Sequence, residues 1–156
     1  MMVYRLAPTR FARDLTGEGA RLFGGRWNHP GYACLYTSGS RALAVLEYSV
    51  NTGAEHIPPA LSIITIDTGT APIREILESA LAPDWKATPA PSYTKDFGSA
   101  ILKSSKEAII KIPSAIITSE HNYLLNPAHP GARKFKILEI TDFHYDLRIK
   151  EWHSLT

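Results

Sequence analysis

The run Gly24, Gly25, Arg26, Trp27 and Asn28 has the residue types of a loop that binds an anion and a ring. Two glycines let the backbone bend, or pass close to a ligand, where a side chain would not fit. A guanidinium, an indole and a carboxamide follow directly, so the loop combines a planar cation that matches phosphate, a stacking surface and a hydrogen-bonding amide. This combination suits an anionic, aromatic ligand such as a nucleotide. The alternative for Arg26 is a surface arginine stacked on Trp27.

Three later residues could complete such a site: Tyr36, Glu47 and Ser114. Tyr36 could stack on a base or a pyridinium ring and still donate its hydroxyl, or it could be a half-buried strand tyrosine. Glu47 could accept a hydrogen bond from a ribose hydroxyl and stabilise positive charge that develops at the anomeric carbon, as carboxylates do in glycosidic cleavage. The alternative for Glu47 is a salt bridge to Arg41 or another cation. Ser114 could hydrogen-bond a carboxamide or a phosphate, or be an ordinary strand serine.

Several other chemistries have no support in the sequence. No G-x-S-x-G motif surrounds Ser114, so it does not have the setting of a hydrolase nucleophile. None of the histidines lies in an H-E-x-x-H motif or a C-x-x-C framework, which gives metal binding little support. Walker and Rossmann glycine patterns are missing as well, so a nucleotide would not be bound in the manner of a dehydrogenase.

The elements that must position these residues are short strands and a few helices. We expect strands over residues 3–7, 33–37, 61–67, 112–117 and 134–140, and helices over residues 41–50, 72–80 and 97–109. The glycine-rich residues 16–31 predict a long functional loop, and the prolines of residues 82–92 predict an irregular connector. This mixture indicates the α+β class.

The helix over residues 41–50 matters most, because it carries Glu47. Ser40 offers a hydroxyl to the first free amides of this helix. The spacing predicts an inner stripe of Ala42, Val45, Leu46 and Ser49. Glu47 then lies at the edge of that stripe, where a carboxylate must be exposed, paired or functional.

Bulk properties are those of one ordinary domain. The chain has 156 residues, a formal net charge of +2 and a pI of about 8.7. A basic balance this weak does not argue for a nucleic-acid partner. Cys34 is the only cysteine, so an internal disulfide is impossible and a reducing cytoplasm is the expected compartment. We find no signal peptide and no apolar run that could cross a bilayer.

With these residues in place, the chain resembles the RES-domain family over nearly its whole length. The family is named for arginine, glutamate and serine positions, and its members are toxins of bacterial toxin–antitoxin pairs with an Xre-like antitoxin. The resemblance is carried by Tyr4-Arg5, Gly24-Gly25-Arg26-Trp27-Asn28, Leu35-Tyr36-Thr37, Ala42-Leu43-Ala44-Val45-Leu46-Glu47, Ile112-Pro113-Ser114-Ala115 and Asn122-Tyr123-Leu124-Leu125-Asn126-Pro127.

The resemblance implies a fold like that of the ADP-ribosyltransferases, in which two small, mostly antiparallel sheets form a cleft for NAD, within a single domain over residues 1–156. NAD would be a substrate that is consumed, with no further cofactor and no metal. The resemblance places Arg26 on phosphate, Tyr36 on nicotinamide and Glu47 on the ribose oxocarbenium, with Ser114 orienting the substrate. It also implies a second group of substrate-binding residues: Arg5, Gly25, Trp27, Asn28 and Asn126.

Three readings of function follow from the resemblance. The first is a toxin that depletes NAD by hydrolysis or phosphorolysis of the nicotinamide–ribose bond. The second is a transferase that attaches ADP-ribose to a macromolecule, and the third is an inactive module that binds its antitoxin. The expected partners are NAD, an Xre-like antitoxin and a second copy of the chain, with no nucleic acid and no membrane. One departure stands out: Gly98 is followed by Ser99, where relatives often carry a tryptophan.

Overall fold

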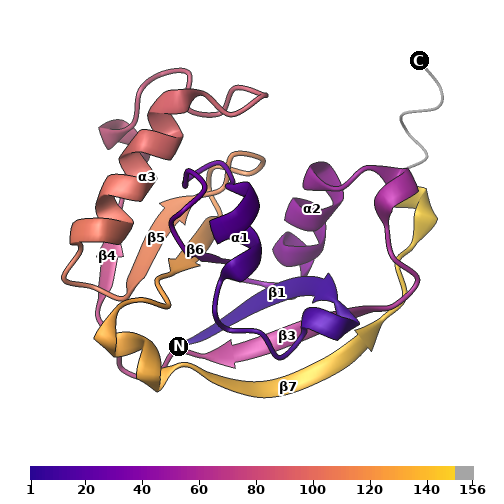
Figure 1. Cartoon of the computed structure of the whole chain (residues 1–156). Coiled ribbons are helices and arrows are strands. Elements are labelled where there is room, and N and C mark those ends of the chain that lie inside the picture. The colour runs from indigo at the N-terminus through magenta and orange to yellow at the C-terminus, as the bar shows by residue number, and fades with distance from the viewer. Residues whose placement is uncertain (150–156) are drawn as a thin grey trace.

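The computed structural model describes residues 1–149 as a mixed α+β fold with seven strands in one sheet (Figure 1). The strands are β1 (Met2–Pro8), β2 (Leu35–Ser38), β3 (Leu61–Asp67), β4 (Ile73–Glu75), β5 (Ile109–Pro113), β6 (His121–Leu125) and β7 (Lys136–Phe143). The helices are α1 (Glu18–Phe23), α2 (Arg41–Asn51) and α3 (Ser92–Ser104). The predicted α+β class is confirmed. No helix among the described residues is long and apolar enough to cross a membrane.

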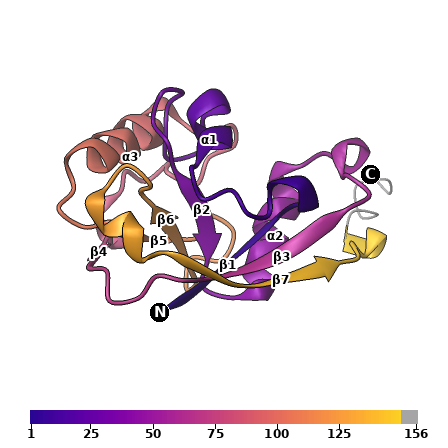
Figure 2. The same ribbon diagram turned by 60° about the horizontal axis from the view of Figure 1, so that its bottom comes forward.

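The sheet has two halves that meet at one point. Its strand order is β4-β5-β6-β2-β1-β3-β7, and every neighbouring pair is antiparallel except β4 with β5. β1 and β2 are registered through the pair Tyr4 with Ser38. The two sheets expected from the sequence are therefore two halves of one sheet. Figure 2 shows them at an angle to one another, with α3 on one half and α2 on the other.

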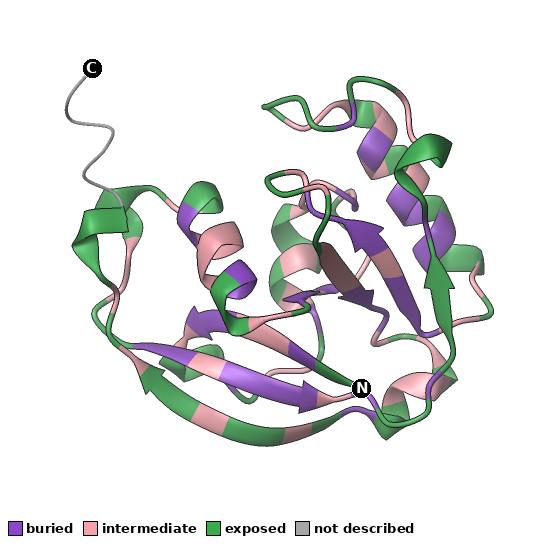
Figure 3. Cartoon of the chain, turned by 180° about the vertical axis from the view of Figure 1, so that it is seen from behind, coloured by how far each residue is buried: buried purple, intermediate pink, exposed green. Residues whose placement is uncertain are grey.

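The core consists of two clusters of buried side chains, and the first of them joins the two halves. The first includes Val3, Ile64 and Ile66 from one half and Ile109 and Leu125 from the other, so it crosses the junction. β-branched residues dominate this sheet face, as expected for strands that pack on a core. The second cluster lies under α3 in the β4–β5–β6–β2 half. Figure 3 shows that burial concentrates in the central strands, while β7 at the edge is largely exposed.

Two predicted elements differ in the structure. Residues 72–80 form a strand, β4, and a short 3₁₀ turn at Glu78–Ala80 instead of a helix, because Ile73 pairs with Ile109 at the sheet edge. The predicted strand at 112–117 lies earlier in the chain: α3 ends at Ser104, and β5 already begins at Ile109. The sequence pattern does not predict β6. This strand matters because it brings Asn122 beside β2.

Helix α2 begins as predicted but turns a different face inward. The Ser40 hydroxyl accepts a hydrogen bond from the Leu43 amide at 3.0 Å, which caps the helix. Of the predicted inner stripe, Ser49 is buried, Val45 and Leu46 are half-buried and Ala42 is exposed. Leu43 and Ala44 are buried instead, so the inner face is shifted by part of a turn. Because Glu47 is one turn beyond Leu43, it lies on the face that meets the sheet.

Candidate active site

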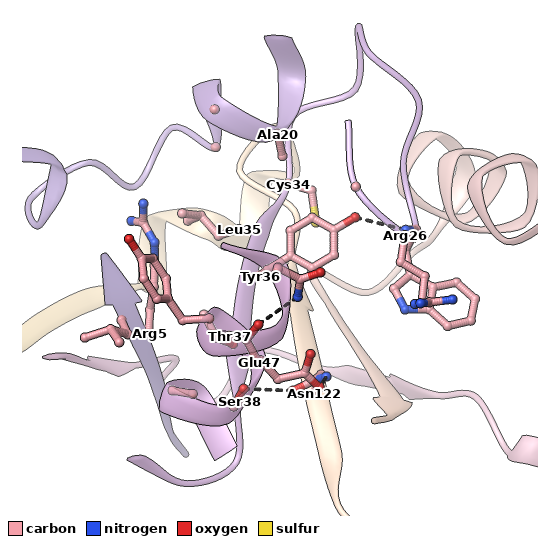
Figure 4. A pocket seen from close by; sticks show the side chains of 18 of the residues that line it. Arg5, Ala20, Arg26, Cys34, Leu35, Tyr36, Thr37, Ser38, Glu47 and Asn122 are labelled. Atoms are coloured by element: carbon pink, nitrogen blue, oxygen red, sulfur yellow. Dashed lines mark hydrogen bonds between the residues drawn. The ribbon is translucent and has the colours of Figure 1, made fainter. Parts of the chain in front are cut away.

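A cavity of about 470 Å³ lies over the junction of the two half-sheets, within the size range of small-molecule sites. β1, β2 and α2 line it, together with α1 and the loop that follows α1. Figure 4 shows Arg5 and Arg26 on opposite sides of Tyr36 and Glu47. The fold thus brings four predicted site residues to one cavity: Arg5 from β1, Tyr36 from β2, Glu47 from α2 and Arg26 from the loop after α1. Gly25 and Trp27 also lie at its wall.

The glycine pair builds a tight turn against Tyr36. The Gly25 amide donates to the Asn28 carbonyl at 3.0 Å, which leaves Arg26 and Trp27 at the tip of the turn. Gly24 has a φ of 72°, in the left-handed region that favours glycine. A Cβ on Gly25 would lie 2.6 Å from the Tyr36 hydroxyl oxygen. Gly25 is therefore required for the close approach of backbone and ring.

Arg26 is half-buried and is held from outside the cavity. Its Nη1 donates to the carbonyl oxygens of Trp85 and Ala87, both at 2.9 Å. Within residues 1–149 its Nε and Nη2 take no part in a hydrogen bond, so those donors are available at the cavity. Burial lowers the pKa of Arg26, and the nearby Glu47 carboxylate opposes that effect. An arginine stays cationic in such a setting.

Arg5 supplies a second cation to the cavity. Its Nη1 donates to the Asp14 carbonyl at 2.9 Å. Burial lowers the pKa of Arg5, and the Asp14 carboxylate raises it. Two guanidiniums and two carboxylates, those of Asp14 and Glu47, therefore line the cavity. The guanidiniums are the groups there that could bind a negatively charged part of a ligand.

Tyr36 presents its ring to the cavity but not its hydroxyl. The hydroxyl accepts from the Trp27 amide at 3.0 Å and donates to Asn28 Oδ1 at 2.6 Å. Burial raises the pKa of Tyr36 well above its ordinary value, so the hydroxyl keeps its proton at neutral pH. The expectation that the hydroxyl could donate to a ligand is therefore wrong in this geometry, while the ring face remains free to stack.

The side chains of Asn28 and Trp27 are buried and contact other parts of the protein. Asn28 is fully buried, and its Nδ2 donates to the carbonyls of Ala20, His29 and Tyr32 at 2.8–3.1 Å. With Oδ1 bound to the tyrosine hydroxyl, this amide has no group left for a ligand.

Trp27 packs against Trp85 and Phe97 with ring centroids 5.9 and 6.3 Å apart, and only 3% of its surface is exposed. The prediction that Asn28 binds substrate is therefore wrong in this structure, whereas Trp27 keeps a place at the cavity wall although its ring is packed inside the protein. The packing of α3 against Trp27 also explains why residue 98 is a glycine. A Cβ at this position would lie 1.9 Å from the Trp27 carbonyl oxygen.

Glu47 is held by two side chains through one carboxylate oxygen. Oε1 accepts from Ser114 Oγ at 2.7 Å and from Asn122 Nδ2 at 2.5 Å. Ser114 is fully buried and its Oγ also accepts from the amides of Ile116 and Ile117 at 3.1 and 3.2 Å. Within residues 1–149, Oε2 receives no hydrogen bond, so this oxygen is the one available to a ligand.

The alternative readings of Glu47 and Ser114 do not fit this geometry. Arg41 pairs with Glu139 at 3.6 Å and stacks on Tyr4, and it makes no salt bridge to Glu47. Ser114 is not an ordinary strand serine either, since its hydroxyl proton is directed at the Glu47 carboxylate.

Asn126 lies away from this cavity. Its Nδ2 donates to the Leu102 carbonyl at 2.7 Å, and its Oδ1 accepts from the Ala128 amide at 3.2 Å. It borders a separate hollow beside the end of α3. The prediction that Asn126 binds the same substrate as Glu47 is therefore wrong in this structure.

Sequence reasoning missed two polar residues of the site, Ser38 and Asn122. Ser38 Oγ donates to Asn122 Oδ1 at 2.8 Å, and the two residues are paired across β2 and β6. Only the run from Asn122 to Pro127 pointed to this region, and it did so as a family motif. Among the described residues, His, Cys, Asp and Glu side chains form no group of three that could hold a metal ion.

Comparison with known proteins gives consistent matches. Residues 2–147 match the family model described as RES domain. "Prs ADP-ribosylating toxin" of Sphingobium sp. (strain YBL2) is 37% identical over 150 residues, covering 92% of this chain and 91% of that protein. "Toxin Res" of Yersinia enterocolitica serotype O:8 / biotype 1B is 32% identical over 152 residues, covering 96% and 100%.

A solved structure has the same fold. It is described as the crystal structure of the M.tuberculosis MbcT-MbcA toxin-antitoxin complex. The TM-score is 0.73 at 22% identity, with 91% of this chain and 83% of that chain covered.

Proposed function

The chain belongs to the RES-domain family, and from this premise we propose that it is the toxin of a toxin–antitoxin pair and that it breaks the nicotinamide–ribose bond of NAD. The single observation that carries the chemistry is the Glu47 carboxylate, fixed through Oε1 by Ser114 and Asn122 in a cavity between two arginines. Relatives named as toxins support the first part, and the resemblance stated above supports the second.

In this mechanism the bond from ribose C1′ to the nicotinamide nitrogen breaks, and its electron pair leaves with nicotinamide. The ring nitrogen thereby loses its positive charge, and positive charge develops on the ribose. Glu47 stabilises that charge through Oε2, at a site where its other oxygen is already held, so little reorganisation is needed. A nucleophile then bonds to C1′ and loses its proton.

The remaining cavity residues would bind and orient NAD. Arg26 would hold the diphosphate, which planar, paired donors suit, and Arg5 would bind another polar part of NAD from the opposite side of the cavity. The Tyr36 ring would stack on nicotinamide, because its hydroxyl is held in place by the loop and its face is open. Holding the nicotinamide and the diphosphate, on either side of the reacting ribose, while the carboxylate faces that ribose is the kind of positioning that lowers a barrier.

The acceptor of ADP-ribose divides the enzymatic readings. Water or inorganic phosphate would give free products and deplete NAD. Transfer to a macromolecule is the second candidate, and one observation favours it: the Sphingobium relative, 37% identical, is named as an ADP-ribosylating toxin. Both candidates begin with the same bond cleavage at Glu47. An inactive antitoxin-binding module has less support, since Arg26, Tyr36, Glu47 and Ser114 are all present and Ser114 is hydrogen-bonded to Glu47.

We propose an Xre-like antitoxin as the protein partner. The similar solved structure is a toxin–antitoxin complex, and the open cavity offers a direct means of inhibition. A segment of the antitoxin placed at the mouth of the cavity would block entry of NAD.

The test is NAD loss over time with purified protein, run beside Glu47→Ala, with and without inorganic phosphate. Adenylate-labelled NAD added with bacterial protein extract provides the second arm. Loss of NAD with the wild-type protein but not with Glu47→Ala supports cleavage. A requirement for phosphate identifies phosphate as the acceptor. Label on protein in the extract supports transfer. Toxicity that survives Glu47→Ala in cells would contradict the mechanism.

A further inference from the structure

Asn122 makes the shortest contact to the Glu47 carboxylate, and we propose that it is a positioning residue for this group, held in turn by Ser38. The inference rests on the proposed function, because it assigns Asn122 a part in the same reaction. It goes beyond that function by naming a residue outside the arginine, glutamate and serine positions. The direction of each hydrogen bond and the places of the three residues in the sheet support it.

The hydrogen bonds fix the orientation of the amide. Ser38 Oγ donates to Asn122 Oδ1 at 2.8 Å, so the carbonyl side of the amide faces β2. The amino side, Nδ2, then points to Glu47 Oε1 at 2.5 Å (Figure 4). A rotated amide would place an oxygen against the carboxylate and lose the bond to Glu47, because an ionised carboxylate can only accept. The carboxylate therefore selects this orientation of Asn122, and the Ser38 hydroxyl supports it by donating to Oδ1.

The position of this chain of bonds gives it a mechanical role. Ser38 of β2 pairs with Tyr4 of β1. Within residues 1–149 this is the one registered pair that joins the half-sheets. Glu47 comes from α2, which packs mainly on β1 of one half and also contacts β2, whereas Asn122 and Ser114 belong to the other half. The bonds to Oε1 therefore join the two walls of the cavity at the point where they meet. Asn122 fixes both the direction of the carboxylate and the distance between these walls.

Two bonds to one oxygen also explain why both donors are needed. Ser114 alone would leave the carboxylate free to rotate about its bond to the chain, so that Oε2 would not stay directed at the ribose. With Asn122 in place, Oε1 is held from two directions. Misplacement of a reacting group by about 1 Å costs roughly 100-fold in rate, so the second bond matters for turnover more than for binding.

Steady-state kinetics of NAD consumption test the role. Asn122→Ala should lower kcat roughly 10- to 100-fold with KM for NAD within about threefold of wild type, because the lost contact acts only on the group that meets the developing charge. Asn122→Asp keeps the volume but replaces the donor with a second carboxylate, and should lose at least as much. Ser38→Ala should lower kcat by a smaller factor. An Asn122→Ala protein with wild-type kcat, or with a loss that lies in KM alone, would overturn the proposal.

A double-mutant cycle in unfolding tests the contact without any NAD. Asn122→Ala and Glu47→Ala should be non-additive, with a coupling of about tenfold in the unfolding equilibrium constant. Asn51→Ala is the matched control: this asparagine donates to the Glu47 backbone carbonyl at 2.8 Å, which alanine retains, so its effect should add to that of Glu47→Ala. If wild type consumes no NAD, the proposed function fails while the cycle still decides whether Asn122 holds Glu47. Additivity of Asn122→Ala with Glu47→Ala would overturn the positioning role.

Discussion

The residues at the cavity divide by where their hydrogen-bonding groups are used. Asn28 directs its whole amide to the loop, and Tyr36 directs its hydroxyl there. Glu47 and Arg26 are different: each is fixed through one terminal atom and keeps another for a ligand. This division separates residues that shape the site from those that meet substrate, and residue type alone does not reveal it. From the sequence, both Asn28 and Arg26 are assigned to substrate, and the structure separates their roles.

The buried thiol of Cys34 makes a prediction about stability at alkaline pH. Burial raises the pKa of Cys34 above its ordinary value of 9.0. The unfolded chain therefore loses this proton as pH rises through 9, while the folded protein keeps it. Because the unfolded state then binds fewer protons, the free energy of unfolding should fall by up to about 1.4 kcal/mol per pH unit between pH 9 and 10.

Denaturant unfolding at several pH values checks this, with Cys34→Ala as the comparison. The variant should be less stable at pH 7 but should show a shallower decline above pH 9, since it has no thiol to titrate. If the free energy of unfolding fell equally steeply with pH in the two proteins, the Cys34 thiol would not contribute to the alkaline loss of stability. Measurements stay below pH 10 because Tyr36, whose pKa is also raised by burial, adds its own decline above that point.

At the scale of elements, the sequence predicts those whose pattern is local. The Ser40 cap and the β-branched run of β3 were sufficient to locate α2 and β3. The inward face of α2 was not predictable, because Glu47 turns inward to meet partners on β6 and after β5 that lie far along the chain. Arg26 is similar. Its partners are backbone carbonyls of the 82–92 connector. Every residue has a backbone carbonyl, so the sequence does not indicate which ones accept from Arg26.

The packing of α3 on the Arg26 loop gives a prediction for a pair of glycines. Gly98→Ala would place a Cβ 1.9 Å from the Trp27 carbonyl oxygen, so helix and loop must move apart. We expect a loss of roughly 1–3 kcal/mol in the free energy of unfolding, as for other overpacked sites. A Cβ on Gly19, in α1, would meet no atom within 4 Å, so Gly19→Ala should be neutral or stabilise by about 0.5–1 kcal/mol. Urea unfolding of both variants measures these changes. Equal changes in the free energy of unfolding for Gly98→Ala and Gly19→Ala would contradict the close contact at Gly98.

For the whole molecule, the question is whether the two half-sheets unfold together. One registered pair between β1 and β2 is a weak link by itself. The first buried cluster, however, includes Val3 and Ile64 from one half and Ile109 and Leu125 from the other, all almost completely buried. Apolar burial shared across the junction couples the halves more strongly than a single backbone pair can. The sequence could not predict this, because the cluster joins residues that are far apart along the chain.

We therefore expect a single cooperative transition, measured with two probes that see different parts of the protein. Trp27 and Trp85 pack together in the β4–β5–β6–β2 half, so their fluorescence reports that half, whereas far-UV circular dichroism reports both. Trp152 lies outside the described residues and is replaced by Phe so that it does not mix the signals. Coincident urea midpoints and slopes for the two probes are the expected result. A fluorescence transition separated from the dichroism transition would mean that the halves unfold independently. In that event neither the shared core nor the Glu47 bonds across the junction would couple the two halves strongly.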